Sequence, residues 1–106
     1  MPKGILYVES RPSSAEEIDE YHRWYAGTHI GEMLEIDGIV SARRLEPLSG
    51  DGSFIALYEI EAEDLEAVRA QMGARARSGQ MSKPVAVQSD PPPTVRLLRE
   101  ISVHTA

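Results

Sequence analysis

Four short apolar runs, each bounded by turn residues, predict four β-strands. The runs span residues 4–9, 39–45, 54–60 and 95–103. Between the second and third runs, residues 47–53 are rich in Gly, Ser and Asp and predict a turn, so these two strands are expected to form an antiparallel hairpin. In the first, third and fourth runs apolar side chains fall on both faces, which is typical of a sheet covered on both sides.

Two segments with a helical repeat lie between these strands. In the first, Ile18, Tyr21 and Tyr25 follow one another at steps of three and four residues, which gives the helix one apolar face. A serine at 13 or 14 can cap it. The helix is expected to run to about Tyr25, to be weakened there by glycines, and to continue as a shorter turn to residue 34.

The second helix is expected after a cap at Asp64, with Leu65, Val68 and Met72 on its buried face. The following residues, 79–94, show no clear period and contain four prolines. That is long for a loop in so small a domain, and such loops often serve as lids or as interface arms.

The predicted order is β-α-β-β-α-β. This is the split-βαβ or ferredoxin-like arrangement of the α+β class, in which both helices lie on one face of a four-stranded antiparallel sheet. The length suits a single domain over residues 1–106. Because two helices cover only one face, the apolar second face needs a partner, and a second copy of the chain is the simplest one. The sequence therefore predicts a homodimer.

Charge and residue content narrow the range of partners. The net charge of −6 argues against nucleic acid or an anionic membrane surface as the main partner. No apolar run approaches the roughly 20 residues that span a bilayer, and the first residues lack the pattern of a secretory signal. The chain has no cysteine, which excludes disulfides, thiolate metal sites and cysteine nucleophiles and fits a cytoplasmic protein.

Residues 21–30, Tyr-His-Arg-Trp-Tyr-Ala-Gly-Thr-His-Ile, concentrate the chemistry of the chain. They hold the only Trp, two of the four Tyr and two of the three His. Such a helix either packs into the core with a few polar tips or lines a ligand pocket with a histidine suited to proton transfer. His22 and His29 lie roughly 10 Å apart along a helix, too far to chelate one metal ion. Phosphate-binding glycine loops and dinucleotide fingerprints are absent, so no metal and no cofactor are expected.

This stretch and the strand after it resemble the dimeric α+β barrel superfamily, most closely its EthD-like branch. In that branch a Trp-Tyr-x-x-x-His pattern lies on the first helix, and a Gly-hydrophobic-x-x-x-Arg strand follows. Residues 24–29 match the first pattern and residues 38–43 match the second. Ala26 and Gly31 stand where typical members have Asp and Pro.

The resemblance implies a range of reactions, because the superfamily includes cofactor-free monooxygenases, polyketide cyclases, lactone isomerases and haem peroxidases. We expect foremost a cofactor-independent enzyme that moves a proton on a small aromatic or polyketide-like molecule, as a cyclase, isomerase or lyase. The alternatives are a non-catalytic small-molecule-binding or stress-associated dimer and a cofactor-free monooxygenase. A haem-dependent enzyme is a weaker alternative.

His29 and Tyr25 are the expected catalytic residues. A neutral imidazole near a helix interruption can act as a general base, and a phenol can orient a ligand oxygen. Tyr7 or Tyr58 could serve in place of Tyr25, and Arg43 would stabilise an anion. The other side chains expected to contact the ligand are those of His22, Trp24 and Met33. The tyrosines, Trp24 and His29 can instead be packing residues of the core, and His22 can be a solvated or interface histidine.

Arg43 and Arg44 are neighbours on a predicted strand, so one of them points to each face. The inward one would be a buried cation, which needs an anion beside it. A substrate carboxylate or enolate would serve, but an internal ion pair with Glu59 or Glu100 is the simpler expectation.

Overall fold

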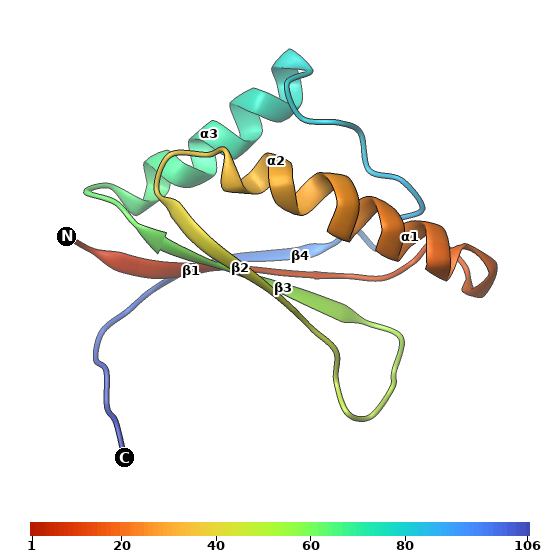
Figure 1. Ribbon diagram of the computed structural model, residues 1–106, viewed down its shortest axis with the longest axis horizontal. Helices are drawn as coiled ribbons and strands as arrows, with labels where there is room; N and C mark the ends of the chain where they lie inside the picture. Colours follow the sequence, from red (N-terminus) through yellow and green to blue (C-terminus); the bar gives the residue numbers. More distant parts are fainter.

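The chain folds into a four-stranded antiparallel sheet with its helices on one face (Figure 1). The structure, a computed structural model, describes residues 1–106. In chain order the elements are β1 (Lys3–Ser10), the 3-10 turn η1 (Ala15–Glu17), α1 (Ile18–Trp24), the π-helix η2 (Tyr25–His29), α2 (Ile30–Leu34), β2 (Ile39–Leu45), β3 (Phe54–Glu61), α3 (Leu65–Ser78) and β4 (Thr94–Arg99).

The strand order in the sheet is β2-β3-β1-β4, and every neighbouring pair is antiparallel. The α+β class, the four-stranded antiparallel sheet and the two helical segments on one face are therefore as predicted. The arrangement is compatible with a ferredoxin-like fold.

The core lies between the sheet and the helices. Leu6 on β1 pairs with Tyr58 on β3, and both side chains are fully buried. From the helices, Tyr21, Met33 and Val68 pack against them as members of one buried cluster. Fully burying a large apolar side chain contributes about 1.5–3 kcal/mol, so these contacts fix the helices on the sheet.

Helix α3 has the ends that its sequence predicts. The carboxylate of Asp64 accepts a hydrogen bond of 3.0 Å from the backbone N–H of Glu66, so the predicted N-cap is confirmed. At the other end Gly79 has a φ of +82°, the left-handed conformation that closes many helices and that glycine adopts without strain. Leu65 and Val68 are buried and Met72 is partly buried, as expected for the inner face.

The first helix is irregular near Tyr25, as expected. The irregularity is the π-helical turn η2, through which the helical backbone continues without a break. Helical backbone runs from Ile18 through η2 to Leu34. Gly27 faces open space, and its cost of about 1 kcal/mol in a helix is offset by the buried side chains on either side of it. No helix of the chain combines the length and the apolar character that crossing a membrane requires.

Strand β4 is shorter than the sequence predicts. It ends at Arg99, whereas the apolar alternation extends to residue 103. The backbone N–H of Glu100 still bonds to the carbonyl of Lys3, the first residue of β1. Strand β1 itself begins at Lys3, and the carbonyl of the preceding residue, Pro2, faces β3, where it accepts from Ala62. The strand therefore ends where its neighbour ends.

The second face of the sheet is not covered by any helix (Figure 1). Register places Ile5 beside Leu98 and Tyr7 beside Leu57 on this open face. None of these side chains is fully buried, and Leu98 and Leu45 are exposed. The expectation that the helices leave one apolar face of the sheet without cover is confirmed.

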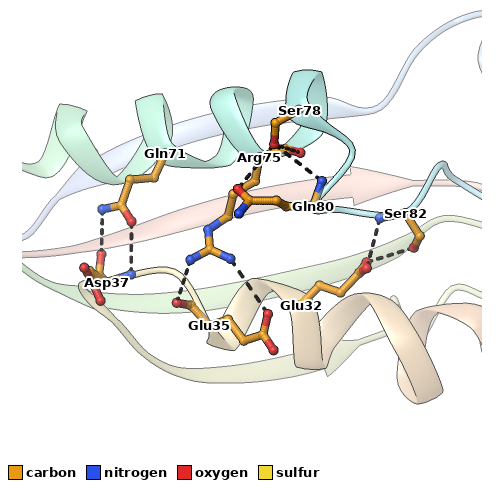
Figure 2. Close-up of polar contacts among 8 residues, drawn as sticks. All are labelled: Glu32, Glu35, Asp37, Gln71, Arg75, Ser78, Gln80 and Ser82. Atoms are coloured by element: carbon orange, nitrogen blue, oxygen red, sulfur yellow. Dashed lines mark hydrogen bonds and ion pairs between the residues drawn. The ribbon is translucent and has the colours of Figure 1, made fainter.

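Residues 79–93 return from α3 to β4 without forming a helix or a named strand, as predicted. Met81 is buried, and Val87 forms an isolated bridge with Pro12. Figure 2 shows how the segment is tied to α2: the backbone N–H and the hydroxyl of Ser82 each donate a 2.9 Å hydrogen bond to the carboxylate of Glu32. Arg75 of α3 adds an ion pair to Glu35 at 3.8 Å. This long segment is thus anchored against the helices.

Candidate functional site

The π-turn η2 sets the positions of the aromatic side chains. Trp24 and His29 are five residues apart, and in an α-helix they would point about 140° away from each other. In a π-helix the repeat is closer to five residues, so the two rings lie over one another, stacked at 4.7 Å with 17° between their planes. π-Turns inside helices are rare and are frequent at functional sites. No residue pattern in the sequence predicts this π-turn.

His29 is inward but tightly packed. Its ring stacks on Trp24 and meets the Tyr25 ring edge-on at 4.9 Å. The Nδ1 atom is buried and has no hydrogen-bond partner. Burial lowers the pKa of His29 below its usual value, with the charge of Glu32 opposing the shift, so the imidazole is neutral at pH 7. None of the five main surface hollows is lined by His29.

His22 lies on α1, and its ring contacts the side chain of Arg44 on β2. A guanidinium nitrogen of Arg44 is 3.0 Å from Nδ1 of His22. Because a guanidinium only donates, Nδ1 must accept, and the ring proton of the neutral imidazole is then on Nε2. Burial lowers the pKa of His22, the Arg44 charge lowers it further, and the charges of Asp19 and Glu46 oppose the shift. His22 is therefore held as a neutral base.

Arg44 is a half-buried cation without a carboxylate partner. Its guanidinium carbon lies 4.7 Å from the centre of the Tyr25 ring and 5.7 Å from that of Tyr21. The expected ion pair of Arg43 or Arg44 with Glu59 or Glu100 does not form. A cation that is partly desolvated and satisfied only by aromatic faces and one imidazole retains the capacity to bind an anion.

A shallow hollow of about 230 Å³ opens onto this cation. Its lining residues come from α1, from the end of β2 with the residue after it, and from the start of β3: His22, Arg44, Leu45, Glu46 and Phe54. The His22 and Phe54 rings meet edge-on with their centres 4.5 Å apart. The hollow thus combines an apolar wall, a neutral imidazole, the carboxylate of Glu46 and a cation that forms no ion pair with that carboxylate.

Beneath the hollow, four hydroxyl-bearing side chains lie between α1, η2 and the sheet. The hydroxyls of Ser10 and Tyr21 are 2.5 Å apart, whereas the hydroxyl of the fully buried Tyr58 has no hydrogen-bond partner. Burial raises the pKa of Tyr58 far above its ordinary value and also raises the pKa of Tyr25. These phenols remain neutral at pH 7 and can donate a hydrogen bond, but they cannot act as phenolate bases.

The other residues expected at the site are dispersed. Tyr7 lies on the open face and its hydroxyl donates to Glu9 at 2.8 Å. Met33 is buried in the core, and the indole N–H of Trp24 donates to Ser82 at 3.3 Å. Arg43 is exposed and shares the open face with Leu57, its register partner. The structure thus brings together Tyr25, Tyr58 and His22, with Trp24 and His29 on the next turn.

A β-bulge decides which arginine faces the helices. Ile39 is buried toward the helices, and regular alternation from it would turn Arg43 inward. The pairing of β2 with β3 shifts between Ile39 and Ser41, so Val40 is the extra residue and the alternation reverses. Arg44 is then the inward residue, and no pattern in the sequence signals this bulge. Ser10, Phe54 and Glu46 were likewise not expected at the site.

No group of three or more His, Asp or Glu side chains is placed to hold a metal ion. The resemblance to the EthD-like branch stays a prediction. Comparison of the chain with protein-family models, with curated proteins and with solved structures finds no match.

Proposed function

We propose that the hollow beside α1 binds a small aromatic or polyketide-like molecule through an anionic oxygen, and that the protein transfers a proton on it without a cofactor. One observation carries this proposal: Arg44 is half-buried, has no carboxylate partner, and is hydrogen-bonded to an imidazole held neutral. A cation beside a neutral base is the pair that enolate chemistry needs, because the base removes a proton while the cation stabilises the charge that develops.

The Arg44–His22 contact suggests how the base is released. In the free protein the Nδ1 lone pair of His22 is used by Arg44. A carboxylate or enolate oxygen is a stronger acceptor for a guanidinium than an imidazole is. An anion that takes the Arg44 donor frees the Nδ1 lone pair to accept a proton from the same ligand. The Tyr25 ring beneath the guanidinium holds Arg44 in place during this exchange.

This assignment differs from the role predicted for His29 and Arg43. His22 lines the hollow and His29 does not. Cyclisation, isomerisation and lyase-type elimination all begin with proton removal, and so does oxygenation of an enolate. The proposal therefore concerns this first step, which these reactions share.

A non-catalytic binding protein is the second candidate, and the size of the hollow favours it. The volume of about 230 Å³ lies below the range of roughly 300–1,000 Å³ that is usual for ligand pockets. A shallow site holds a ligand less completely away from water, which weakens the electrostatic part of catalysis. In this case Arg44 and the aromatic wall bind the anion and His22 only accepts a hydrogen bond.

We further propose that the protein is a homodimer in which two copies pack through their open faces, in the manner of a dimeric α+β barrel. The face carries Ile5, Leu57 and Glu59 on the two central strands and Leu98 and Arg43 on the two edge strands, so two copies related by a two-fold axis can pair opposite charges. A cytoplasmic location remains part of the proposal.

Phenylpyruvate is a suitable probe because it is aromatic, carries a carboxylate and has an enolisable carbon. Its keto–enol conversion is followed by ultraviolet absorption, and its binding by calorimetry. We expect catalysis by the protein, a loss of about 100-fold or more in kcat for His22→Gln, and a rise of about tenfold or more in KM for Arg44→Gln.

Two neighbouring positions give matched controls. Arg43→Gln removes the same charge from the other face, and His29→Gln removes the packed imidazole; both should keep the rate of the unaltered protein. If His29→Gln abolishes turnover and His22→Gln does not, the base is His29. If phenylpyruvate binds through Arg44 without turnover, the protein is a binding protein. Failure to bind phenylpyruvate and related aromatic carboxylates would contradict both candidates.

A further inference from the structure

We propose that Glu46 sets the specificity of the hollow beside α1, and that the ligand is an aromatic monoanion with a hydroxyl group next to its anionic oxygen. The proposal rests on the anion site proposed above and deepens it, because it names a class of ligand. It concerns binding alone, so it holds for an enzyme and for a binding protein.

Glu46 and Arg44 lie two residues apart on the same side of the chain. Strand β2 ends at Leu45, but a proline at 47 favours extended backbone at the residue before it, so the alternation of the strand continues to Glu46. Both side chains line the hollow. Two residues of extended chain place their points of attachment roughly 7 Å apart. A small ligand in the hollow therefore meets both charges.

The two charges do not neutralise each other. Arg44 and Glu46 form no ion pair, and Glu46 is exposed. The Arg44 guanidinium is held instead by groups of the helix, at 3.0 Å from Nδ1 of His22 and 4.7 Å from the centre of the Tyr25 ring. The Glu46 charge still acts on the imidazole, because it opposes the lowering of the pKa of His22. The carboxylate thus faces the place where a ligand on Arg44 would react.

This arrangement discriminates between anions. The anionic oxygen of the ligand takes the donors of Arg44. An ionised carboxylate only accepts hydrogen bonds, so Glu46 favours a ligand with a hydroxyl group beside that oxygen. A second anionic group at the same position is repelled by the Glu46 charge. The Phe54 ring, which meets the His22 ring edge-on, gives the aromatic part of the ligand an apolar wall.

The same preference fits the chemistry proposed for the site. The enol of an aromatic 2-oxo acid carries an O–H group next to its carboxylate, whereas the keto form carries a carbonyl there and has no donor. A carboxylate at this position therefore favours the enol over the keto form. Glu46 would stabilise the enol by contact, while His22 remains the proposed base.

Three ligands isolate the group that faces Glu46, because they share a phenylmethyl group and a carboxylate. Phenyllactate has a hydroxyl beside the carboxylate, phenylpropionate has a hydrogen there, and benzylmalonate has a second carboxylate. Calorimetry measures their binding without turnover, in a slightly alkaline buffer in which both carboxyl groups of benzylmalonate are ionised. We expect phenyllactate to bind about fivefold more tightly than phenylpropionate.

Two substitutions separate the charge of Glu46 from its hydrogen bond. Glu46→Gln keeps an acceptor and removes the charge, so it should raise the affinity for benzylmalonate about tenfold relative to phenylpropionate and retain the preference for phenyllactate. Glu46→Ala removes both groups and should abolish that preference. Because Glu46 is exposed and forms no ion pair, neither change disturbs the core. Glu63→Gln removes an exposed charge beyond the other end of β3 and should leave all three affinities unchanged.

Arg44→Gln distinguishes the two ways in which the proposals can fail. If all three ligands bind, and bind through Arg44, but the substitutions at Glu46 leave their relative affinities unchanged, Glu46 does not select the ligand and the anion site stands. Relative affinities that shift as much in Glu63→Gln as in Glu46→Gln would assign the discrimination to net charge and overturn the role of Glu46. If none of the three binds to the unaltered protein, both proposals are wrong.

Discussion

The two faces of the sheet carry different chemistry although the same strands supply both. The face covered by helices holds Tyr58, Ser10 and Arg44 beneath an aromatic layer. The open face holds aliphatic side chains together with Tyr7, Glu59 and Arg43. One step along β2 therefore separates an arginine suited to an anionic ligand from an arginine suited to a second protein surface. Alternation along a strand divides a small chain into a ligand side and a partner side.

The largest expected effect concerns packing on the two faces. Leu6→Ala, on the covered face, should lower the free energy of unfolding by about 2–5 kcal/mol at any protein concentration, because it leaves a cavity in the core. Leu57→Ala, on the open face, should act through the dimer, so its effect should depend on protein concentration. Urea unfolding at two concentrations measures both. Equal losses without concentration dependence would mean that the open face is not an interface.

Two tyrosine variants compare the covered face with the open face again. The expected change in stability is smaller than for the leucines, and for Tyr58→Phe it is a gain. The Tyr58 hydroxyl is buried without a partner, so Tyr58→Phe should raise the free energy of unfolding by about 1 kcal/mol. The Tyr7 hydroxyl bonds to Glu9 at the surface of the open face, and Tyr7→Phe should change stability by less than about 0.5 kcal/mol. Thermal unfolding of both variants decides this. A loss on Tyr58→Phe would show that its hydroxyl has a partner, of which the nearby hydroxyl of Tyr25 is the first candidate.

The architecture could be predicted from the sequence because it depends on local patterns. The apolar run of 39–45 matches β2 at both ends, and the cap at Asp64 marks the start of α3. The alternation in the sequence predicts β4 but continues past its end, since the end of the strand is set by where β1 ends. Strand ends depend on a neighbour that is distant in sequence.

The candidate site could be predicted only in part. The stretch from Tyr21 to His29 stands out in the sequence, and the helix does face the sheet there. The inward arginine depends on the bulge at Val40, and the stacking of His29 depends on the π-turn. Each is a shift of one residue in backbone register, which side-chain periodicity does not encode. Such shifts move the side chains that carry chemistry and leave the fold unchanged.

The smallest expected effect is a dependence of stability on pH that belongs to the covered face. His22 and His29 both lie on the helices of that face, and burial lowers the pKa of each below its ordinary value of 6.5. In the unfolded chain they titrate near 6.5. As the pH falls below about 6.5, the unfolded state binds protons that the folded state does not bind, so the free energy of unfolding decreases. Above that pH these two groups contribute no slope.

Urea unfolding between pH 8 and pH 5 tests this, because Asp51, whose pKa is lowered by hydrogen bonds from Ser53, stays ionised over that range in both states. The double variant His22→Gln and His29→Gln should flatten the profile. The two single variants then divide the slope between the imidazole at the hollow and the one packed against Trp24. If the slope belongs to His29 alone, then His22 is free to take up a proton in the folded protein, and the Arg44 contact does not hold it neutral. If His22 contributes, its imidazole is held neutral by burial and by the Arg44 charge before any ligand arrives, as the proposed proton transfer requires.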